Sequence, residues 1–538
     1  MSTTPVKINH KIEDYTKLNF LGFLLASFGA IMLAVFVSAT QSYFITDALG
    51  IGTKVGSYIG TLGFYDELLS MCLVPFIGVL SDKIGARPII SFGFFIAGIS
   101  LLGLGYFVRQ NVYPWMLFWR LIFSVGLTSS IGVLTVMLIE LNNSNINVKD
   151  FLSFKSEEEQ VHIASTLNEI DNINRKRNDG KKVSIMGIMS GLGAVFAVTV
   201  LLRLPVVFGQ TLPAGDAVRK SYYTVGLLAI AMSIILFFIV YHNKDQTMFR
   251  DEIDDLFDEL DARDSVGIAD DEAPSSTGIS NNNRSDSYIK SLKQGIQLSI
   301  QNPMILLAYF GGFVARCITI TVSLFVPFYI NHYFYSSGKC TSSNTDKVHC
   351  PESYILSSIL TGIANTMALV FAPVAGILLD KTSNHAHMLL IGNSISILGF
   401  GSISFVSTPD ASSIVFVSAM LMGMAQITFI VSSMTMISNI ASQDRYYKYK
   451  GSISGVSSFV GGIGILFINK VGGYLGDIDS RGPFMFIAAL NILFMIMMLV
   501  LKRVKENDDR DFQSIADKLK ATQIGRFVFR GQQDSVNF

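Results

Sequence analysis

Long apolar segments alternate with short polar ones over most of this chain. Twelve of the apolar segments approach or exceed the roughly 20 residues that a helix needs to cross the hydrocarbon core of a bilayer. Lipid offers no hydrogen bonds, so the backbone of a crossing segment must pair its own N–H and C=O groups within a helix. The pattern predicts membrane-spanning helices at residues 18–46, 55–80, 88–107, 113–141, 184–206, 221–241, 302–330, 353–379, 386–406, 411–440, 451–471 and 482–501.

A short sequence near the end of the second predicted helix recurs near the end of the eighth. Pro, Gly, Asp and Lys appear in the same order, and each residue lies 298 positions before its copy. Such a recurrence is expected of a duplicated six-helix unit whose two copies cross the membrane in the same direction. We therefore predict an all-α integral membrane protein built from two six-helix bundles, at 18–241 and 302–501. The repeated residues are Pro75, Gly78, Asp82 and Lys83, with the copies Pro373, Gly376, Asp380 and Lys381.

The polar segments divide the chain further, at 1–17, 142–183, 242–301 and 502–538. Lys and Arg gather on the side of the membrane where these segments fall, which places that side and both termini in the cytoplasm. Residues 142–183 are expected to form a helix or two at the membrane face. The acidic segment 242–301 is expected to be a solvated linker between the bundles, with a docking site or phosphorylation target as the alternative.

Composition excludes several classes of function. Half of the residues are apolar and 15% are charged, against about a quarter charged in soluble domains. The formal net charge is zero, so there is no global field to attract nucleic acid. The sequence contains no Walker motif, no metal-ligand spacing and no nucleophile–base pattern. We expect neither an enzyme nor an ATP-driven pump, and no cofactor or metal.

The four cysteines fit the predicted topology. Cys72 and Cys317 fall inside helices and are expected to be buried as small apolar residues. Cys340 and Cys350 fall in the loop after the seventh helix, on the side opposite the cytoplasm. We predict that these two form a disulfide, because that side of the membrane is oxidising.

One motif after the second helix resembles a known signature. Gly78-x-x-x-Asp82-Lys83-x-Gly85-x-Arg87 is similar to the sequence between the second and third helices of the major facilitator superfamily. The copy after the eighth helix keeps Gly376, Asp380 and Lys381 but has Ser383 and His385 in place of Gly and Arg. Together with the Asn/Ser-rich linker, this suggests a fungal-type member of that family.

Two further helices resemble the family less closely. In the fourth, Arg120 precedes Gly126 as in the family, but Ser124 replaces an expected Gly. In the fifth, Gly187, Gly191 and Gly193 follow the order of the antiporter signature but lack its Pro. The missing Pro counts against antiport without excluding it, so symport and antiport both stay as alternatives.

The resemblance implies a cavity between the two bundles that opens to each side of the membrane in turn. It implies that Asp82, Gly85 and Arg87, and more weakly Asp380, belong to the gate between the bundles. It also implies a monomer that carries a small molecule.

Charged and amide side chains within the predicted spans are candidate functional residues, because a charge in the membrane is unfavourable unless it is paired or hydrated. Asp66 and Glu67 form either a proton or substrate site or, with Arg120, a structural ion pair. Adjacent helical residues point about 100° apart, so we expect one acid to face the cavity and the other a neighbouring helix. Arg316 is either a contact for a substrate anion or a structural partner for another group.

Two amides complete the candidates. Asn365 lies at the position in the second repeat that matches Glu67. Gln426, midway along the tenth helix, is either a cavity contact or a helix–helix hydrogen bond.

These observations favour a secondary active transporter of a small organic solute that works by alternating access. Proton coupling is one alternative for its energy source, and the buried arginines favour an anionic or zwitterionic substrate. The competing interpretation is a transporter-like sensor or scaffold that signals through the linker and the tail. Membrane lipid surrounds the protein in either case, and the plasma membrane and the vacuole or another endomembrane are equal alternatives for its location.

Overall fold

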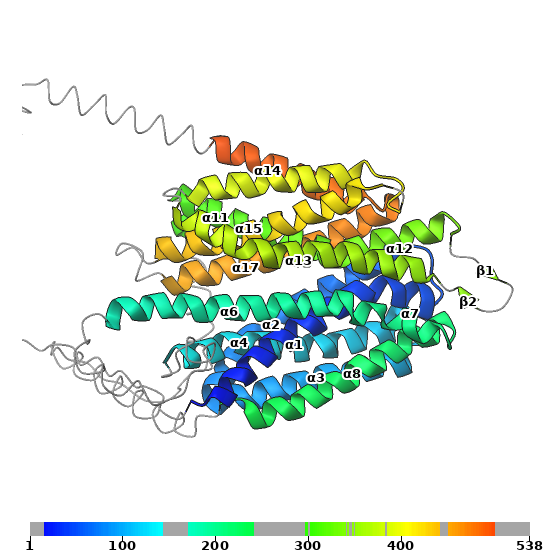
Figure 1. The fold of residues 1–538 in the computed structure, drawn as a ribbon, viewed down its shortest axis with the longest axis horizontal. Helices are drawn as coiled ribbons and strands as arrows, with labels where there is room; N and C mark the ends of the chain where they lie inside the picture. Colours follow the sequence, from blue (N-terminus) through cyan, green and yellow to red (C-terminus); the bar gives the residue numbers. More distant parts are fainter. Residues whose placement is uncertain are drawn as a thin grey trace, which may run out of the picture.

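The computed structural model describes residues 15–143, 171–241, 296–299, 302–339, 342–343, 347–348, 350–381, 385–410, 412–441 and 450–500. Over these residues the chain is a bundle of long helices that run nearly side by side (Figure 1). The helices before and after the linker form two separate groups, which lie against each other along their length.

The first group spans the N-terminal half of the chain. Three of its crossings contain a short π- or 3₁₀-helical turn that continues the α-helix, and this lengthens or bends the crossing. The elements are α1 (Lys17–Tyr43) with π-helix η1 (Phe44–Ala48), α2 (Val55–Ile84), α3 (Ala86–Phe107), η2 (Val112–Met116) with α4 (Leu117–Asn143), α6 (Asp171–Thr199) with η4 (Leu201–Arg203) and α7 (Leu204–Gly209), and α8 (Ala214–Ile239).

The second group spans the C-terminal half. Its elements are α11 (Pro303–Ile320) with η6 (Thr321–Phe325) and α12 (Val326–Ser336), α13 (Pro351–Lys381), α14 (His385–Ser404), α15 (Ile414–Ala441), α17 (Lys450–Ile478) and a last helix over 482–500. Strands β1 (Ser342–Ser343) and β2 (Lys347–Val348) form a small antiparallel hairpin in the loop between α12 and α13.

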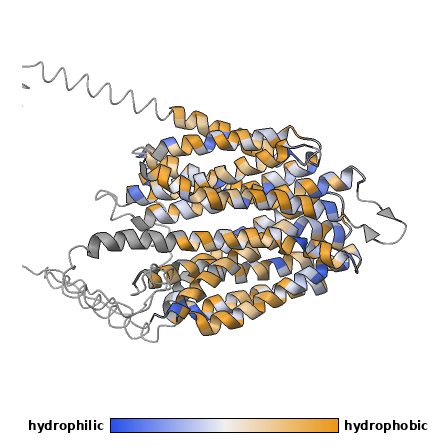
Figure 2. Ribbon diagram, viewed as in Figure 1, coloured by the Kyte–Doolittle hydropathy of each residue, from blue (hydrophilic) through white to orange (hydrophobic). Residues whose placement is uncertain are grey.

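The predicted membrane fold is confirmed. Within the described residues, eleven helices are long and apolar enough to cross a membrane. The 30-residue α2, which carries Asp66 and Glu67, packs in the same bundle and makes the twelfth. Apolar residues cover the helices along their length, while polar residues are frequent near the ends of the bundle (Figure 2).

Local sequence signals account for several helix ends. The Thr16 hydroxyl accepts a hydrogen bond from the Asn19 N–H and so caps the start of α1. Asn302 caps α11 in the same way, with Pro303 in the first turn, where its missing N–H has no consequence. At the other end of α2, Gly85 has a φ of +82°, which L side chains rarely adopt, and this ends the helix before α3 begins.

Two helices begin earlier than predicted. The fifth crossing begins at Asp171, inside the segment 142–183 that we expected to lie outside the bundle, and the sixth begins at Ala214 instead of 221. Hydrophobicity marks where a helix enters lipid, whereas a helix can continue into water. In the sixth crossing, Arg219 bonds the carbonyl oxygen of Ala48 and Lys220 lies 4.8 Å from the ring centre of Phe208, so this charged turn is held in place outside the apolar region.

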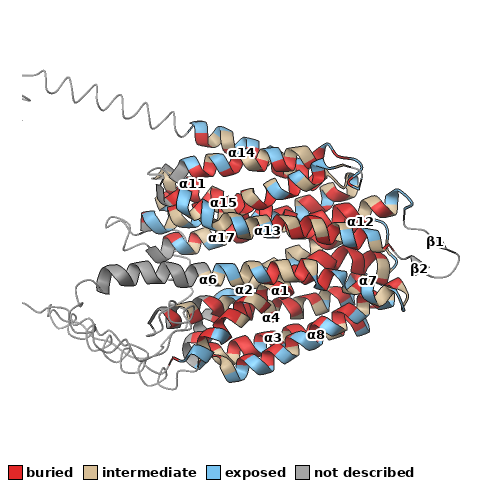
Figure 3. Ribbon diagram, viewed as in Figure 1, coloured by how far each residue is buried: buried red, intermediate tan, exposed pale blue. Residues whose placement is uncertain are grey.

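The bundle has two distinct ends. We call the end that carries β1 and β2 the hairpin end, and the opposite end, where 241 leads into the linker, the linker end. The repeated motifs of α2 and α13 both lie at the linker end, as a parallel duplication requires. Buried residues are concentrated towards the hairpin end, in α12 and at the end of α1 (Figure 3).

The two halves make their closest backbone contact between α2 and α17. A Cβ atom on Gly60 would overlap the carbonyl oxygen of Asn469, and one on Gly473 would lie 2.5 Å from the carbonyl oxygen of Gly56. Only glycine permits helix axes to approach this closely. We call the contact between Gly56, Gly60 and Gly473 the glycine seam.

Candidate functional site

A cavity of about 270 Å³ lies between the two halves near the middle of the bundle. The N-terminal half contributes residues of α1, α2 and α4 to its wall. The C-terminal half contributes Ile320, Leu324, Ile465 and Asn469 from α11, η6 and α17. Asp66, Glu67 and Arg120 line this cavity, so the structure brings three of the predicted charged residues together.

Asp66 and Arg120 form an ion pair across α2 and α4. The Arg120 Nη2 atom donates a hydrogen bond to Asp66 Oδ2, and the Arg120 side chain is almost fully buried. Ser124, which stands where the family pattern has Gly, donates to the backbone carbonyl of Asp66 at 2.9 Å. The structural ion pair considered from the sequence is therefore present, and it lies in the cavity wall.

Glu67 points towards the other half of the molecule. A Cβ atom on Gly462 of α17 would lie 3.2 Å from Glu67 Oε1, and one on Gly461 would lie 3.3 Å from the Cγ atom of Arg316. Arg316 is also the strongest charge acting on Glu67. The two acids diverge as expected of adjacent helical residues. However, the expectation that only one of them faces the cavity is wrong, because both line it.

The cavity also contains two amides that we did not predict. Gln41 of α1 is 1% exposed and Asn469 of α17 is 2% exposed, and both line the cavity. Neither amide atom of Gln41 has a hydrogen-bond partner, and the same is true of Asn469 Oδ1. The available signal was a polar side chain within a predicted span, the same signal that identified Gln426.

The two predicted amides lie elsewhere. Asn365 of α13 is not among the residues that line the cavity, and its Nδ2 atom donates to the carbonyl oxygen of Thr361 on its own helix at 2.8 Å. Gln426 of α15 is buried away from the cavity, with Oε1 unpartnered. The repeat relates the depths of Glu67 and Asn365 along their helices, but it does not give both residues the same surroundings.

The hairpin end is closed by a carboxylate of the N-terminal half. Asp47 of η1 accepts hydrogen bonds from Tyr335 of α12 and Tyr354 of α13, each at 2.6 Å. The neighbouring Thr46 hydroxyl donates to the same carboxylate at 2.8 Å and accepts from Asn331 Nδ2 at 3.1 Å. We call these five residues the outer closure.

Further hydrogen bonds reinforce this end. The Tyr43 hydroxyl bonds the Ser353 carbonyl at 3.0 Å, the backbone N–H of Ser57 donates to Asp477 at 2.9 Å, and Arg203 Nε donates to the Ser358 hydroxyl at 3.1 Å. Within the described residues, all hydrogen bonds that join the halves lie between the hairpin end and mid-bundle. Arg316 is exposed although it lies within a span.

The predicted gate residues lie at the linker end. Gly85 forms the break between α2 and α3, and Arg87 Nε donates to the carbonyl oxygen of Phe237 on α8, with its guanidinium 4.8 Å from the Phe237 ring centre. A Cβ atom on Gly376 would meet nothing within 4 Å. The other gate candidates belong to helices whose backbone is described but whose side-chain surroundings are not: Gly78, Asp82, Lys83, Asp380 and Lys381.

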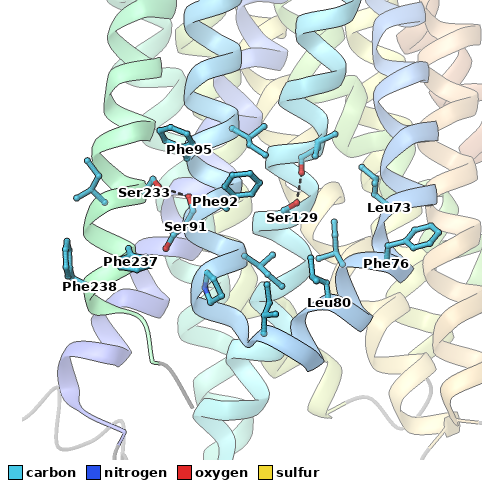
Figure 4. Close-up of a pocket in the computed structure, with 17 residues that line it drawn as sticks. Leu73, Phe76, Leu80, Ser91, Phe92, Phe95, Ser129, Ser233, Phe237 and Phe238 are labelled. Carbon is cyan, nitrogen blue, oxygen red and sulfur yellow. Dashed lines mark hydrogen bonds between the residues drawn. The ribbon is translucent and has the colours of Figure 1, made fainter. Parts of the chain in front are cut away.

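A larger hollow of about 800 Å³ lies on one side of the N-terminal half. It is lined by apolar side chains of α2, α3, α4 and α8, including Phe76, Phe92, Phe95 and Phe237 (Figure 4). The Ser129 and Ser233 hydroxyls bond backbone carbonyl oxygens, and no charged residue lines this hollow. Phe76 and Phe92 are strongly exposed, as expected of side chains that face lipid, so size alone does not identify the functional cavity.

The cysteines agree with prediction only in part. Cys317 is a buried free thiol, whereas Cys72 is free but exposed, so the expectation of burial is wrong for Cys72. Its helix turns this position outwards, to a surface that lipid covers. Cys350 is disulfide-bonded. Its predicted partner Cys340 lies outside the described residues, so the pairing stays a prediction.

Comparison with known families agrees with this architecture. A family model described as Major Facilitator Superfamily matches residues 171–468 and, in a second overlapping match, 352–532. Two curated proteins match shorter parts of the chain. The tetracycline resistance protein, class H, of Pasteurella multocida is 27% identical over 149 residues, and magnetosome protein MamH of Paramagnetospirillum magneticum is 25% identical over 207 residues. These matches cover 27% and 38% of this chain, and 34% and 44% of the two relatives.

Solved structures match over most of the chain. The nucleoside transporter NupG superposes with a TM-score of 0.58 at 13% identity, over 90% of this chain and 99% of that one. The inward open conformation of the xylose transporter XylE from E. coli superposes with a TM-score of 0.54 at 14% identity, over 90% and 94% of the two chains. At these identities the likeness concerns the fold alone.

Proposed function

Because the chain belongs to the Major Facilitator Superfamily, we propose that it is a secondary transporter that carries a small organic solute by alternating access. The observation that supports this most is the polar cavity between the halves, which hydrogen bonds between the halves close at the hairpin end. A solute held there is separated from the hairpin end by the outer closure. To release the solute on that side, the outer closure must open.

The predicted topology gives this state an orientation. If both termini are cytoplasmic, the linker end faces the cytoplasm and the structure is an inward-facing state. In the opposite state, the ends of α2 and α13 would approach each other and close the linker end. The repeated motifs lie at those ends, which supports their proposed role as gate residues.

We propose an anionic or zwitterionic solute. Arg120 supports this, since its guanidinium lines the cavity and its Nε and Nη1 atoms have no hydrogen-bond partner among the described residues. Arg316, exposed on the opposite half, is a second positive charge for a negatively charged group. Both arginines lie where a solute carboxylate or phosphate would pass.

We propose that Glu67 carries a coupled proton. Asp66 is less suited to this role, because Arg120 holds it in an ion pair. Glu67 lines the cavity and has no hydrogen bond within the described part of the chain, so gain and loss of a proton would break no fixed bond. Arg316 belongs to the other half, so movement of the halves would change the distance between Glu67 and this positive charge.

Flux measurements in proteoliposomes test this proposal. The full-length protein would be assayed with an imposed pH gradient against amino acids, monocarboxylates, dicarboxylates, monosaccharides and nucleosides. We expect uptake of an anionic or zwitterionic solute that the proton gradient accelerates. In Glu67→Gln protein the gradient should lose its effect, while solute exchange without a gradient continues.

A matched control is Glu352→Gln, which removes an exposed carboxylate at the start of α13. This variant should keep gradient-driven uptake. Gradient-driven uptake that survives Glu67→Gln would refute the assignment of the proton site but not transport itself. If no solute moved under any gradient, the sensor or scaffold interpretation would be favoured, and the linker and tail would be tested for partners.

A further inference from the structure

Within the described part of the chain, four polar side chains in the wall of the central cavity have hydrogen-bonding atoms without partners. They are both amide atoms of Gln41, Nε and Nη1 of Arg120, Oδ1 of Asp66 and Oδ1 of Asn469. Gln41, Arg120 and Asn469 are each less than one-tenth exposed, and all four residues line the same cavity. Three of them come from the N-terminal half and Asn469 comes from the C-terminal half.

Such a cluster is unfavourable for a protein that only needs to fold. A buried polar atom without a partner destabilises a protein by about 1–3 kcal/mol, and buried polar groups in proteins are usually paired. The cluster contains donors on Arg120 and Gln41 and acceptors on Asp66, Asn469 and Gln41. A ligand that satisfies it must therefore present both an acceptor group and a donor group.

The charges around the cavity restrict the ligand further. Asp66 pairs with Arg120 within the N-terminal half. Glu67 and Arg316 lie beside the adjacent glycines Gly462 and Gly461 of α17, Arg316 next to the lining and not within it. With both acids ionised, these four charges cancel. A ligand with a net charge would place an unbalanced charge among them, whereas a net-neutral ligand with separated charges would not.

Size is the last restriction. Pockets for drug-sized ligands enclose roughly 300–1,000 Å³, and this cavity encloses about 270 Å³. We infer that the cavity binds a small zwitterion of the amino-acid type. Its carboxylate would accept from Arg120 and its ammonium group would donate to Asp66 and Asn469, so that one ligand contacts both halves. Gln41 and Asn469 would be the residues that determine this specificity.

This inference rests on the proposed function and narrows its substrate class. Its test is direct binding to the purified full-length protein in detergent, which does not depend on flux. Tritiated neutral amino acids would be the probes. Each would compete with two unlabelled analogues, the amine that lacks the carboxylate and the carboxylate that lacks the amine. We expect each analogue to bind at least tenfold more weakly than the parent amino acid, because each leaves part of the cluster unpartnered.

Two variants test the assigned residues. Gln41→Met and Asn469→Leu keep side-chain size but remove the amide, and each should weaken binding by about tenfold. Asn393→Leu is the matched control. Asn393 of α14 is equally buried and also has an unpartnered Oδ1, but it does not line the cavity. Binding to this control should equal that of the wild type once size-exclusion profiles show that all three variants are folded.

The outcomes separate this inference from the proposed function. Equal binding of a zwitterion and its analogues in the wild type, which needs no variant, would overturn the inference. Wild-type affinity in both Gln41→Met and Asn469→Leu would do the same. If the proteoliposome panel shows flux of a sugar, a nucleoside or a singly charged ion while no amino acid binds, the inference is wrong and the transporter stands.

Discussion

The outer closure and the central cavity each contain a partly buried carboxylate of the N-terminal half, and the hydrogen bonds of the two carboxylates differ. Both oxygens of Asp47 accept hydrogen bonds from tyrosines of the opposite half. Asp66 has one oxygen bonded to Arg120 of its own half and one oxygen without a partner. In this state both carboxylate oxygens of the closure are hydrogen-bonded, whereas one carboxylate oxygen in the cavity is not.

This difference indicates what each region does. Bonds that cross between the halves stabilise one arrangement of the halves, and they must break when that arrangement changes. A bond within one half can persist through the whole cycle, and the unpartnered atoms beside it are available to a solute. In the proposed transport cycle, the outer closure would control which end is open, and the central cavity would recognise the solute.

The largest expected effect comes from removing one partner of the cavity ion pair. Arg120→Leu leaves the Asp66 carboxylate buried without its partner, and we expect the free energy of unfolding to fall by about 3–5 kcal/mol. The double variant Asp66→Asn/Arg120→Leu should recover most of this loss, because it leaves no unpaired carboxylate at position 66. Chemical unfolding in detergent, followed by fluorescence, measures both. If the single variant were as stable as the double variant, the pair would contribute nothing to folding.

An intermediate effect is expected at the outer closure. Asp47→Asn weakens two hydrogen bonds to a charged group, each contributing about 1.5–3 kcal/mol, so the population open at the hairpin end should rise by tenfold or more. Spin labels on Gly52→Cys and Ser337→Cys, in a Cys72→Ser/Cys317→Ala background, would report the distance between the halves. A longer distance is expected in the Asp47→Asn protein.

Two checks accompany that measurement. Asp216→Asn removes a half-exposed acid at the same end that pairs only with Arg219 of its own helix, and it should leave the distance unchanged. Mass spectrometry should find two labels per chain, because the predicted Cys340–Cys350 disulfide leaves no other free thiol. An unchanged distance in the Asp47→Asn protein would show that other contacts hold the hairpin end closed.

The smallest effect is expected at the surface of the hairpin end. Hydrogen bonds from Arg481 hold the pKa of Asp479 below its usual value. A carboxyl group with a lowered pKa contributes stability above about pH 4, and this contribution is lost as the pH falls through the pKa of the folded state. Both side chains are about one-third exposed, so water screens the pair and Arg481→Ala should reduce stability at pH 7 by less than about 1 kcal/mol. The unfolding temperatures of the two proteins should converge as the pH falls below about 4, and a difference that grew on acidification would contradict this interpretation.

The helices and their duplication could be predicted from the sequence, because each leaves a clear pattern in it. Every crossing needs a long apolar segment, and a repeated motif retains its spacing. Asp66 and Arg120 could also be identified, because charges are rare within such segments. The sequence left open whether these residues form a proton or substrate site or a structural ion pair. The answer depends on how α2 and α4 pack, which local sequence does not encode.

Asp47 and Asn469 were missed because they fall at predicted helix ends. The first span was predicted to end at residue 46, but η1 continues the helix to Ala48 and buries the Asp47 region between the halves. The eleventh was predicted to end at 471, close to Asn469, but α17 continues to Ile478 and places Asn469 in the cavity wall. The tyrosine that meets Asp47 is 288 positions away in the chain, so only the folded structure reveals the contact.

The glycine seam between α2 and α17 also affects the route into the cavity. Where Gly56, Gly60 and Gly473 bring two backbones into direct contact, no acyl chain and no hydrated ion can pass between the helices. At this level the seam is a lateral seal that separates the polar interior from the lipid. On this side of the bundle a solute could then enter only along the bundle axis, and replacing one of these glycines with a bulkier residue would push the two helices apart and open a lateral path.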